Sequence, residues 1–331
     1  MGTEIVSTNR QPPGRPTGAG PLPAIILNAG ANARYAYAEF FGDEVENEHT
    51  RKVYRHAVDR FLAWCETQSH ELHRIPPGSV GQYIRSLTTT RRKPASKPTQ
   101  KLHLAAIRKF FDTLVVRHAV VINPAASVHG PKLKMTVCKT PAADPEQARR
   151  VLQVIDASNV VGLRDRAIIA TLIYTACRVG AVAKLQRKHF YTDGRQWYLH
   201  LDEKGGNDRQ IPCRHDLQAY IEEYLAAAGA IPDADAPLFR TAVRRTRRLT
   251  MLSMQAKDIH GVVKRRLKDA GLPKLLTCHS FRATTATDLL EQGVPIEDVQ
   301  QLLGHADLRT TRLYDRRDRK VTRNIVERIS I

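Results

Sequence analysis

Residues 278–315 read CHSFRATTATDLLEQGVPIEDVQQLLGHADLRTTRLYD and combine basic side chains with a single phenol. His279 and Arg282 stand three residues apart at the start of a helical pattern. Residues at that spacing lie on one face of a helix, so the two side chains can address one anion together. A guanidinium is a planar fork that matches phosphate oxygens. The start of this stretch therefore predicts an anion-binding helix.

The middle of the stretch predicts a helix stop and a second, shorter helix. Gly293 and Pro295 end the first helix, because a glycine just past a helix end is commonly followed by a proline. A short helix is expected at Ile296–Leu303, and Gly304 is expected to end it.

The end of the stretch carries the second histidine and the phenol. His305 follows the short helix directly, and Asp307–Tyr314 can form another turn or two of helix. That turn would return the Tyr314 hydroxyl toward the pocket of His279 and Arg282. The sequence thus predicts that basic groups and one phenol converge.

This stretch resembles the C-terminal signature of the tyrosine recombinases, also called phage-type integrases. The resemblance rests on three motifs, which are HSFR at 279–282, LGH at 303–305 and YD at 314–315. Each motif alone is common, but all three in this order and spacing are specific. The resemblance implies a mainly α fold with a small β-sheet, in which a helical core-binding domain precedes an α+β catalytic domain.

The charge balance indicates a polyanionic partner. The chain of 331 residues has 52 Lys and Arg against 33 Asp and Glu, which gives a net charge of +19 and a pI near 10.0. Nucleic acid is the usual partner of such a chain. Charge alone leaves a ribosome-associated or merely soluble basic protein open. With 42% hydrophobic residues the chain can bury the cores of two domains.

Cysteine usage and hydropathy indicate a cytoplasmic protein. The five cysteines lie far apart and form no C-x-x-C pair, so neither a zinc site nor a disulfide framework is expected. The apolar runs are too short to span a bilayer, and no signal-peptide pattern opens the chain. We therefore expect reduced thiols and no membrane partner.

Composition divides the chain into four parts. A Pro- and Gly-rich leader is followed by amphipathic helices, then by a Pro- and Lys-containing linker, and then by a mixed region. The expected boundaries are a flexible leader with a possible short helix at 1–42, the helical DNA-binding domain at 43–130, the linker at 131–144, and the catalytic domain with a C-terminal tail at 145–331.

Apolar side chains at helical spacing predict the first helix of the core-binding domain, with Thr50 as its cap. Basic residues border a later helix, and others cluster after residue 243. A solvated surface explains such residues about as well as contact with DNA does in a chain of this charge. The candidates for DNA contact are Lys97, Lys101, Arg108, Arg244 and Arg245.

Arg178 follows the apolar run AIIATLIYTA at 167–176, which predicts that it is partly buried. A buried arginine needs a partner, either a structural carboxylate or an anionic ligand. By resemblance, Arg178 matches the first catalytic arginine of the tyrosine recombinases. The family usually has an acidic residue three positions later, where this chain has Ala181. The absence of an acid at position 181 leaves two interpretations: the acidic partner of Arg178 lies elsewhere in the chain, or the activity is reduced.

A β-hairpin is expected over 190–212, with strand residues at Gln196–Leu201 and a turn at Gly205-Gly206-Asn207. Lys204 stands at the start of that turn. A lysine at a hairpin tip is nearly always only solvated. By resemblance, however, Lys204 matches the catalytic hairpin lysine of the family.

The resemblance also implies a mechanism that uses no metal and no cofactor. Tyr314 would attack the scissile phosphate and form a covalent 3′-phosphotyrosine, while Arg178 and Arg282 neutralise its oxygens. Lys204 would protonate the leaving 5′-oxygen. His279 would assist proton transfer at the tyrosine, and His305 would hydrogen-bond the phosphate.

The resemblance implies a site-specific recombinase or integrase that acts on double-stranded DNA recombination sites as a homotetramer in the synapse. A catalytically inactive, sequence-specific DNA-binding relative is the alternative, motivated by Ala181. A type IB topoisomerase uses the same chemistry, but the order of domains favours recombination.

Overall fold

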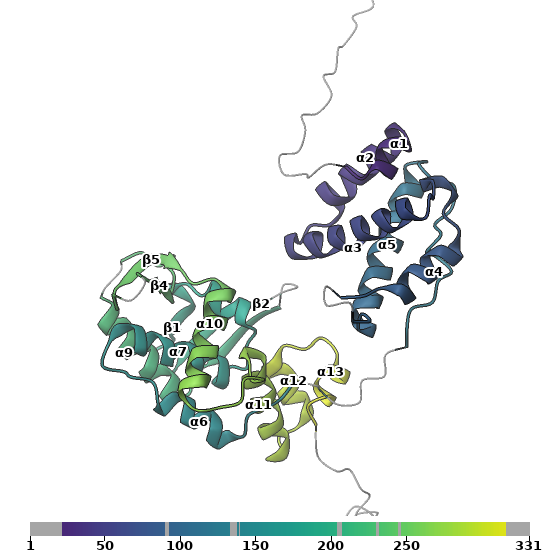
Figure 1. Ribbon diagram of the computed structural model, residues 1–331. Helices are drawn as coiled ribbons and strands as arrows, with labels where there is room; N and C mark the ends of the chain where they lie inside the picture. Colours follow the sequence, from purple (N-terminus) through teal and green to yellow (C-terminus); the bar gives the residue numbers. More distant parts are fainter. Residues whose placement is uncertain are drawn as a thin grey trace, which may run out of the picture. The chain divides into compact units, whose positions relative to one another are not determined.

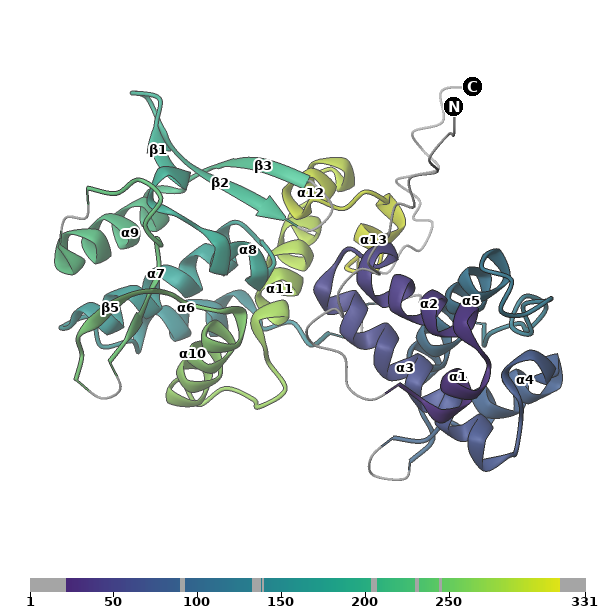
Figure 2. The same ribbon diagram turned by 90° about the horizontal axis from the view of Figure 1, so that it is seen from above.

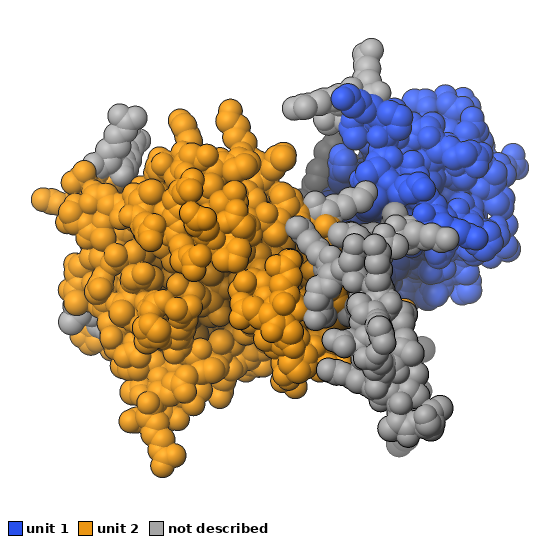
Figure 3. All heavy atoms as spheres, turned by 90° about the horizontal axis from the view of Figure 1, so that it is seen from below, with its two compact units in different colours: residues 1–134 blue, residues 135–331 orange. Residues whose placement is uncertain are grey.

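The computed structural model describes residues 22–89, 93–132, 138, 140–203, 207–229, 232–243 and 246–315. The chain divides into two compact units, unit 1 at 1–134 and unit 2 at 135–331, coloured blue and orange in Figure 3.

Unit 1 is built from helices, coloured purple to blue in Figure 1. The first long helix is capped by Asn47, whose side-chain oxygen accepts the Thr50 amide at 3.0 Å. The expectation of Thr50 as the cap was therefore wrong by three residues, because Asn47 offers the acceptor and Thr50 lies inside the first turn. The helices of unit 1 are α1 Ala24–Asn28, α2 Ala31–Glu39, the π-helix η1 Phe40–Glu44, α3 Glu48–Thr67, the 3₁₀ turn η2 Leu72–Arg74, α4 Pro77–Ser86 and α5 Lys97–Val116.

Residues 24–41 contribute helices to the core of unit 1. For 1–42 we expected a flexible leader with a possible short helix, and residues 1–21 of it lie outside the described part of the chain. Tyr37, Phe40 and Phe41 are buried. Their ring centroids lie 5.9, 5.4 and 6.2 Å from that of Phe110 in α5. Aromatic rings bury large apolar areas, which explains why these helices pack onto α5.

Unit 2 combines helices with two small antiparallel sheets. The three-stranded sheet has the order β1-β2-β3, and β4 pairs with β5. The helices are α6 Pro145–Gln153, α7 Val160–Tyr174, α8 Val179–Lys184, the 3₁₀ turn η3 Arg187–His189, α9 His215–Ala228, α10 Ala256–Asp269, α11 Cys278–Glu291, α12 Ile296–Leu303 and α13 Leu308–Arg312. The strands are β1 Phe190–Thr192, β2 Trp197–Glu203, β3 Asn207–Pro212, β4 Arg240–Ala242 and β5 Leu249–Ser253.

Helix α7 is the central element of unit 2. It contacts α6, α8, α9, α10 and α11, and its residues from Ala167 to Leu172 are buried on every side. A helix that is apolar all round needs such surroundings. At its start the fully buried Asp165 accepts hydrogen bonds from Arg164 and from Arg266 of α10, which ties the two helices together.

The hairpin of β2 and β3 reaches α12. Glu203 pairs with Asn207 across the hairpin, so Asn207 lies in β3. The expectation that Asn207 belongs to the turn was wrong. Arg209 of β3 donates to the carbonyl oxygen of Leu302 in α12, and Figure 2 shows the hairpin directed at α11 and α12. Arg209 thereby connects β3 to the helices of the C-terminal motif.

A small second core lies under that motif. Helix α12 spans Ile296–Leu303 as predicted and ends at Gly304, which adopts the left-handed conformation with φ 60° and ψ 45°. The buried residues that pack together here are Ala176, Ala283, Ala286, Leu290, Val299, Leu303 and Tyr314. This cluster joins the end of α7 to α11, α12 and the tyrosine.

The predicted fold class, mainly α with a small β-sheet in the second unit, is confirmed. In the described part of the chain, no helix has the length and apolar character that crossing a bilayer requires.

Candidate active site

Arg282 occupies the buried face of α11. Arg282 is 1% exposed. Its two terminal guanidinium nitrogens donate to the carbonyl oxygens of Ala176 and Leu303. Ala176 follows the end of α7 with φ 47°, and Leu303 ends α12. Carbonyls at helix ends carry partial negative charge, which favours a buried cation. The Nε atom has no hydrogen-bond partner among the described residues.

Arg178 is the N-cap residue of α8, and its side chain is partly exposed. Its guanidinium forms an ion pair with Glu203, the last residue of β2. The Arg178 backbone amide also donates to Glu203 Oε1 at 3.1 Å. Arg178 therefore has a buried carboxylate partner that the sequence analysis did not identify.

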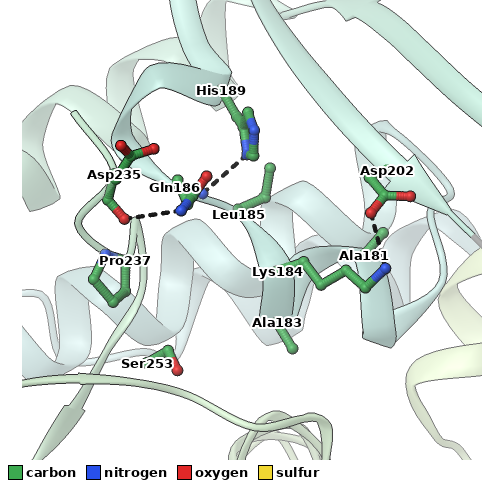
Figure 4. Close-up of a pocket in the computed structure, with 10 residues that line it drawn as sticks. All are labelled: Ala181, Ala183, Lys184, Leu185, Gln186, His189, Asp202, Asp235, Pro237 and Ser253. Atoms are coloured by element: carbon green, nitrogen blue, oxygen red, sulfur yellow. Dashed lines mark hydrogen bonds and ion pairs between the residues drawn. The ribbon is translucent and has the colours of Figure 1, made fainter.

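Ala181, at the position where an acid was expected, is buried on α8. It lines a pocket of about 520 Å³ together with Lys184 and Asp202, whose ion pair of 2.9 Å is drawn in Figure 4. Helix α8 reads VGAVAK and holds no acidic residue. The carboxylate beside Arg178 therefore comes from β2 and not from α8.

Arg209 is a second residue that the sequence analysis missed. Its Nη2 donates to Glu203 Oε1 at 2.7 Å, and its Nη1 donates to the Leu302 carbonyl oxygen. A Cβ atom on Gly304 would lie only 2.9 Å from Arg209 Nε. Arg209 thus packs against the turn that precedes His305. Its place in β3, shortly after the hairpin turn, was the available signal.

The Tyr314 side chain is packed into the site. The residue is 4% exposed, and its hydroxyl oxygen lies 3.3 Å from His279 Nε2. Burial raises the pKa of the Tyr314 hydroxyl, although the Arg282 charge acts in the opposite direction. The backbone of this segment is held by Thr287, whose hydroxyl donates to the Tyr314 carbonyl oxygen at 3.3 Å.

His305 stacks on the Tyr314 ring, with centroids 5.9 Å apart and planes 13° apart. Its Nδ1 lies 2.9 Å from the Thr311 hydroxyl, which fixes the ring orientation. Burial, followed by the positive charges of Arg282 and Arg178, lowers the pKa of His305 to about 4. The same causes lower the pKa of His279. Both imidazoles are therefore neutral at neutral pH.

The structure brings five of the six predicted catalytic residues together: Arg178, His279, Arg282, His305 and Tyr314. The sixth, Lys204, falls outside the described residues, and so do Arg244 and Arg245. The roles assigned to these residues stay predictions.

Three candidates for DNA contact lie on α5. Lys97 and Lys101 are exposed. Arg108 donates from Nε to the Ala125 carbonyl oxygen at 3.2 Å and from Nη2 to that of Val128 at 2.8 Å. Arg108 therefore holds the turn that follows α5, while the two lysines remain available to a ligand. Their assignment to DNA stays a prediction.

A helical unit is thus followed by an α+β unit in which the buried Arg282 lies near Tyr314. The model of the phage integrase family matches residues 142–320, and that of the phage integrase N-terminal SAM-like domain matches 44–119. The chain belongs to the phage integrase family, whose members are the tyrosine recombinases.

Named relatives agree with this family. The chain is 27% identical over 269 residues to tyrosine recombinase XerC of Leptospira interrogans, which covers 81% of this chain and 83% of the relative. It is 30% identical over 230 residues to XerC of Salmonella typhi, which covers 69% of this chain and 72% of the relative.

Solved structures share the fold at lower identity. XerH site-specific recombinase bound to difH substrate is 17% identical with a TM-score of 0.64, and the match covers 90% of this chain and 93% of that chain. A lambda integrase dimer bound to a COC′ core site is 17% identical with a TM-score of 0.62, covering 92% and 83%. At this level of identity the likeness concerns the fold.

Proposed function

We propose that this tyrosine recombinase is a site-specific recombinase or integrase that cleaves and rejoins DNA strands through a covalent 3′-phosphotyrosine. The observation that carries the proposal is the placement of the Tyr314 hydroxyl 3.3 Å from His279 and in the field of the buried Arg282. A phenol between a neutral imidazole and a guanidinium is suited to attack a phosphate.

The nucleophile needs a proton acceptor. Burial raises the pKa of Tyr314, so its hydroxyl is protonated at neutral pH. The pKa of His279 is lowered by burial and by the charges of Arg282 and Arg178, so its imidazole is neutral and can accept the phenolic proton. Both shifts oppose proton transfer from Tyr314 to His279 in the free site, so the transfer accompanies the attack, in which the phosphate takes up the developing negative charge.

Cleavage then proceeds as a transesterification. The bond from Tyr314 Oη to phosphorus forms, the bond from phosphorus to the 5′-oxygen breaks, and Lys204 gives a proton to that oxygen. Arg178 and Arg282 stabilise the additional negative charge in the transition state. Rejoining reverses these steps with a 5′-hydroxyl from the partner strand.

The DNA substrate is proposed from solved relatives, and the tetramer from the resemblance to the tyrosine recombinases. XerH was solved bound to difH substrate, and lambda integrase was solved as a dimer bound to a core site. We infer that this chain binds double-stranded recombination sites and acts as a homotetramer in the synapse, with Lys97 and Lys101 of unit 1 on the DNA phosphates. Arg244 and Arg245 supply further phosphate contacts from unit 2.

The test is a nicked suicide substrate that carries a candidate site from the genomic neighbourhood of the coding sequence. The nick lets the short strand leave after cleavage, so a covalent adduct accumulates on a denaturing gel. Wild type is expected to form the adduct without Mg²⁺, and Tyr314→Phe is expected to bind the same DNA without forming it. Equal adduct yields from the two proteins would reject Tyr314 as the nucleophile.

A second candidate function is specific DNA binding without catalysis, which the alanine at position 181 favours. Specific binding by wild type with no adduct would support it. The presence of the Glu203 carboxylate at Arg178 favours the catalytic function instead.

A further inference from the structure

We propose that Glu203 is the residue that positions the active-site arginine Arg178 and, through Arg209, the turn that carries His305. The proposal rests on the proposed recombinase function. The Glu203 side chain is fully buried, and α8, which begins at Arg178, offers no carboxylate of its own because its sequence is VGAVAK.

Glu203 fixes Arg178 at two points. It accepts the Arg178 backbone amide at 3.1 Å and pairs with the Arg178 guanidinium. The first contact holds the start of α8, and the second sets the direction of the side chain. A charge-assisted hydrogen bond to a buried carboxylate restricts the orientation of a long side chain. Arg178 is partly exposed, so without Glu203 its guanidinium would sample other orientations.

The same carboxylate also holds Arg209, which contacts the turn before His305. Glu203 Oε1 also accepts from Arg209 Nη2 at 2.7 Å, and Arg209 Nη1 donates to the Leu302 carbonyl oxygen at the end of α12. Arg209 in turn packs against Gly304, the residue before His305. One carboxylate therefore joins Arg178 to the turn of His305.

Electrostatics keep the carboxylate ionised. Burial alone raises the pKa of Glu203, but the Arg178 amide and the charges of Arg209, Arg178 and Arg282 together bring it below its ordinary value. The local charge of two bound guanidiniums exceeds that of one carboxylate, so a net positive charge remains for a phosphate. Glu203 thus orients Arg178 and Arg209 without neutralising their combined positive charge.

Glu203 also begins the hairpin loop. It is the last residue of β2 and pairs with Asn207 across the hairpin, and Lys204 follows it in the chain. Anchoring Glu203 to Arg178 therefore fixes the end of β2, the residue directly before Lys204 in the sequence.

The test replaces Glu203 by Gln and uses Asp202→Asn as the matched control. Asp202 is the neighbouring residue of the same strand, but it forms an exposed ion pair with Lys184. Single-turnover adduct formation is measured at saturating protein, with DNA affinity and melting temperature recorded for each variant. We expect Glu203→Gln to slow cleavage of bound DNA by roughly 10- to 100-fold, as loss of a positioning partner does, while Asp202→Asn cleaves like wild type.

A substrate without charge on the scissile phosphate separates positioning from a structural role. Replacing one non-bridging oxygen by methyl, as a mixture of both stereoisomers, removes the negative charge that Arg178 neutralises. The loss caused by Glu203→Gln is expected to shrink to about threefold or less on this substrate, because the placement of Arg178 then matters less. A purely structural defect would slow both substrates equally, and that result would overturn the proposal.

Glu203→Asp covers the case in which the Gln variant does not fold. It keeps the charge but draws the carboxylate back by about 1.5 Å, one carbon–carbon bond, so an intermediate loss of cleavage is expected. Cleavage at the wild-type rate by either variant would overturn the role of Glu203 while leaving the recombinase function intact. Failure of wild type itself to form an adduct on DNA that it binds would instead overturn the proposed function.

Discussion

Gly304 connects the helix end of α12 to His305 and tolerates no side chain. It lies in the left-handed region with φ 60° and ψ 45°. A Cβ atom there would lie 2.9 Å from Arg209 Nε and 3.0 Å from Arg209 Cδ. Arg209 is held by Glu203 and by the Leu302 carbonyl, so it cannot move away without losing those bonds. We predict that Gly304→Ala destabilises unit 2 and misplaces His305.

The expected magnitude combines two costs. A non-glycine residue in the left-handed conformation costs about 1–2 kcal/mol, and overpacking at a restrained neighbour costs about 1–3 kcal/mol. The free energy of unfolding should therefore fall by about 2–4 kcal/mol, since the two costs partly relax each other. In urea this corresponds to a midpoint lower by roughly 1–2 M.

Tryptophan fluorescence can measure this in unit 2 alone. The chain has two tryptophans, Trp64 in unit 1 and Trp197 in unit 2, so a Trp64→Phe background leaves Trp197 as the reporter. Gly261→Ala is the control, because that exposed position inside α10 has open space for a methyl group and alanine favours helix by up to about 1 kcal/mol. A free energy of unfolding of Gly304→Ala within about 0.5 kcal/mol of wild type would show that Ala at position 304 causes no strain.

Three further predictions follow from local geometry. The folded-state pKa of His305 is about 4 against an ordinary 6.5, so the unfolded chain binds a proton at His305 at a higher pH than the folded chain does. The free energy of unfolding therefore falls as the pH drops from 6.5 toward 4. His305→Gln should make that fall with pH less steep in urea titrations. Gly162→Ala would set its Cβ 1.7 Å from the Asp156 carbonyl oxygen, so we expect a loss above about 3 kcal/mol, read from Trp197 unfolding or from failure to express folded protein. Asn47→Ala should cost unit 1 about 1 kcal/mol in Trp64-monitored unfolding by removing the α3 cap; no change would place the cap elsewhere.

The sequence predicted the elements whose limits are set locally. Ile296–Leu303 is a helix in the structure because its apolar spacing and the glycine after it act within a few residues. The convergence of His279, Arg282 and Tyr314 was predicted because all three lie in one short stretch.

Contacts between distant residues could not be predicted in this way. Glu203 meets Arg178 across 25 positions in the sequence, and nothing in the local pattern distinguishes it from a solvated strand-end carboxylate. Arg209 reaches Leu302 across 93 positions. The folding of residues 24–42 onto α5 depends on rings that find Phe110 only in three dimensions. In each of these three contacts the partner residue is determined by the tertiary structure and not by the local sequence.

Identifying the residue that carries DNA tests the central claim most directly. The adduct from wild type and the nicked substrate would be digested with trypsin and nuclease, and the nucleotide-bearing peptide sequenced by mass spectrometry. We predict that the nucleotide is attached to Tyr314 in the peptide that follows Arg312, and that no such peptide arises from Tyr314→Phe. A nucleotide attached to any other residue would contradict the assignment of the active site.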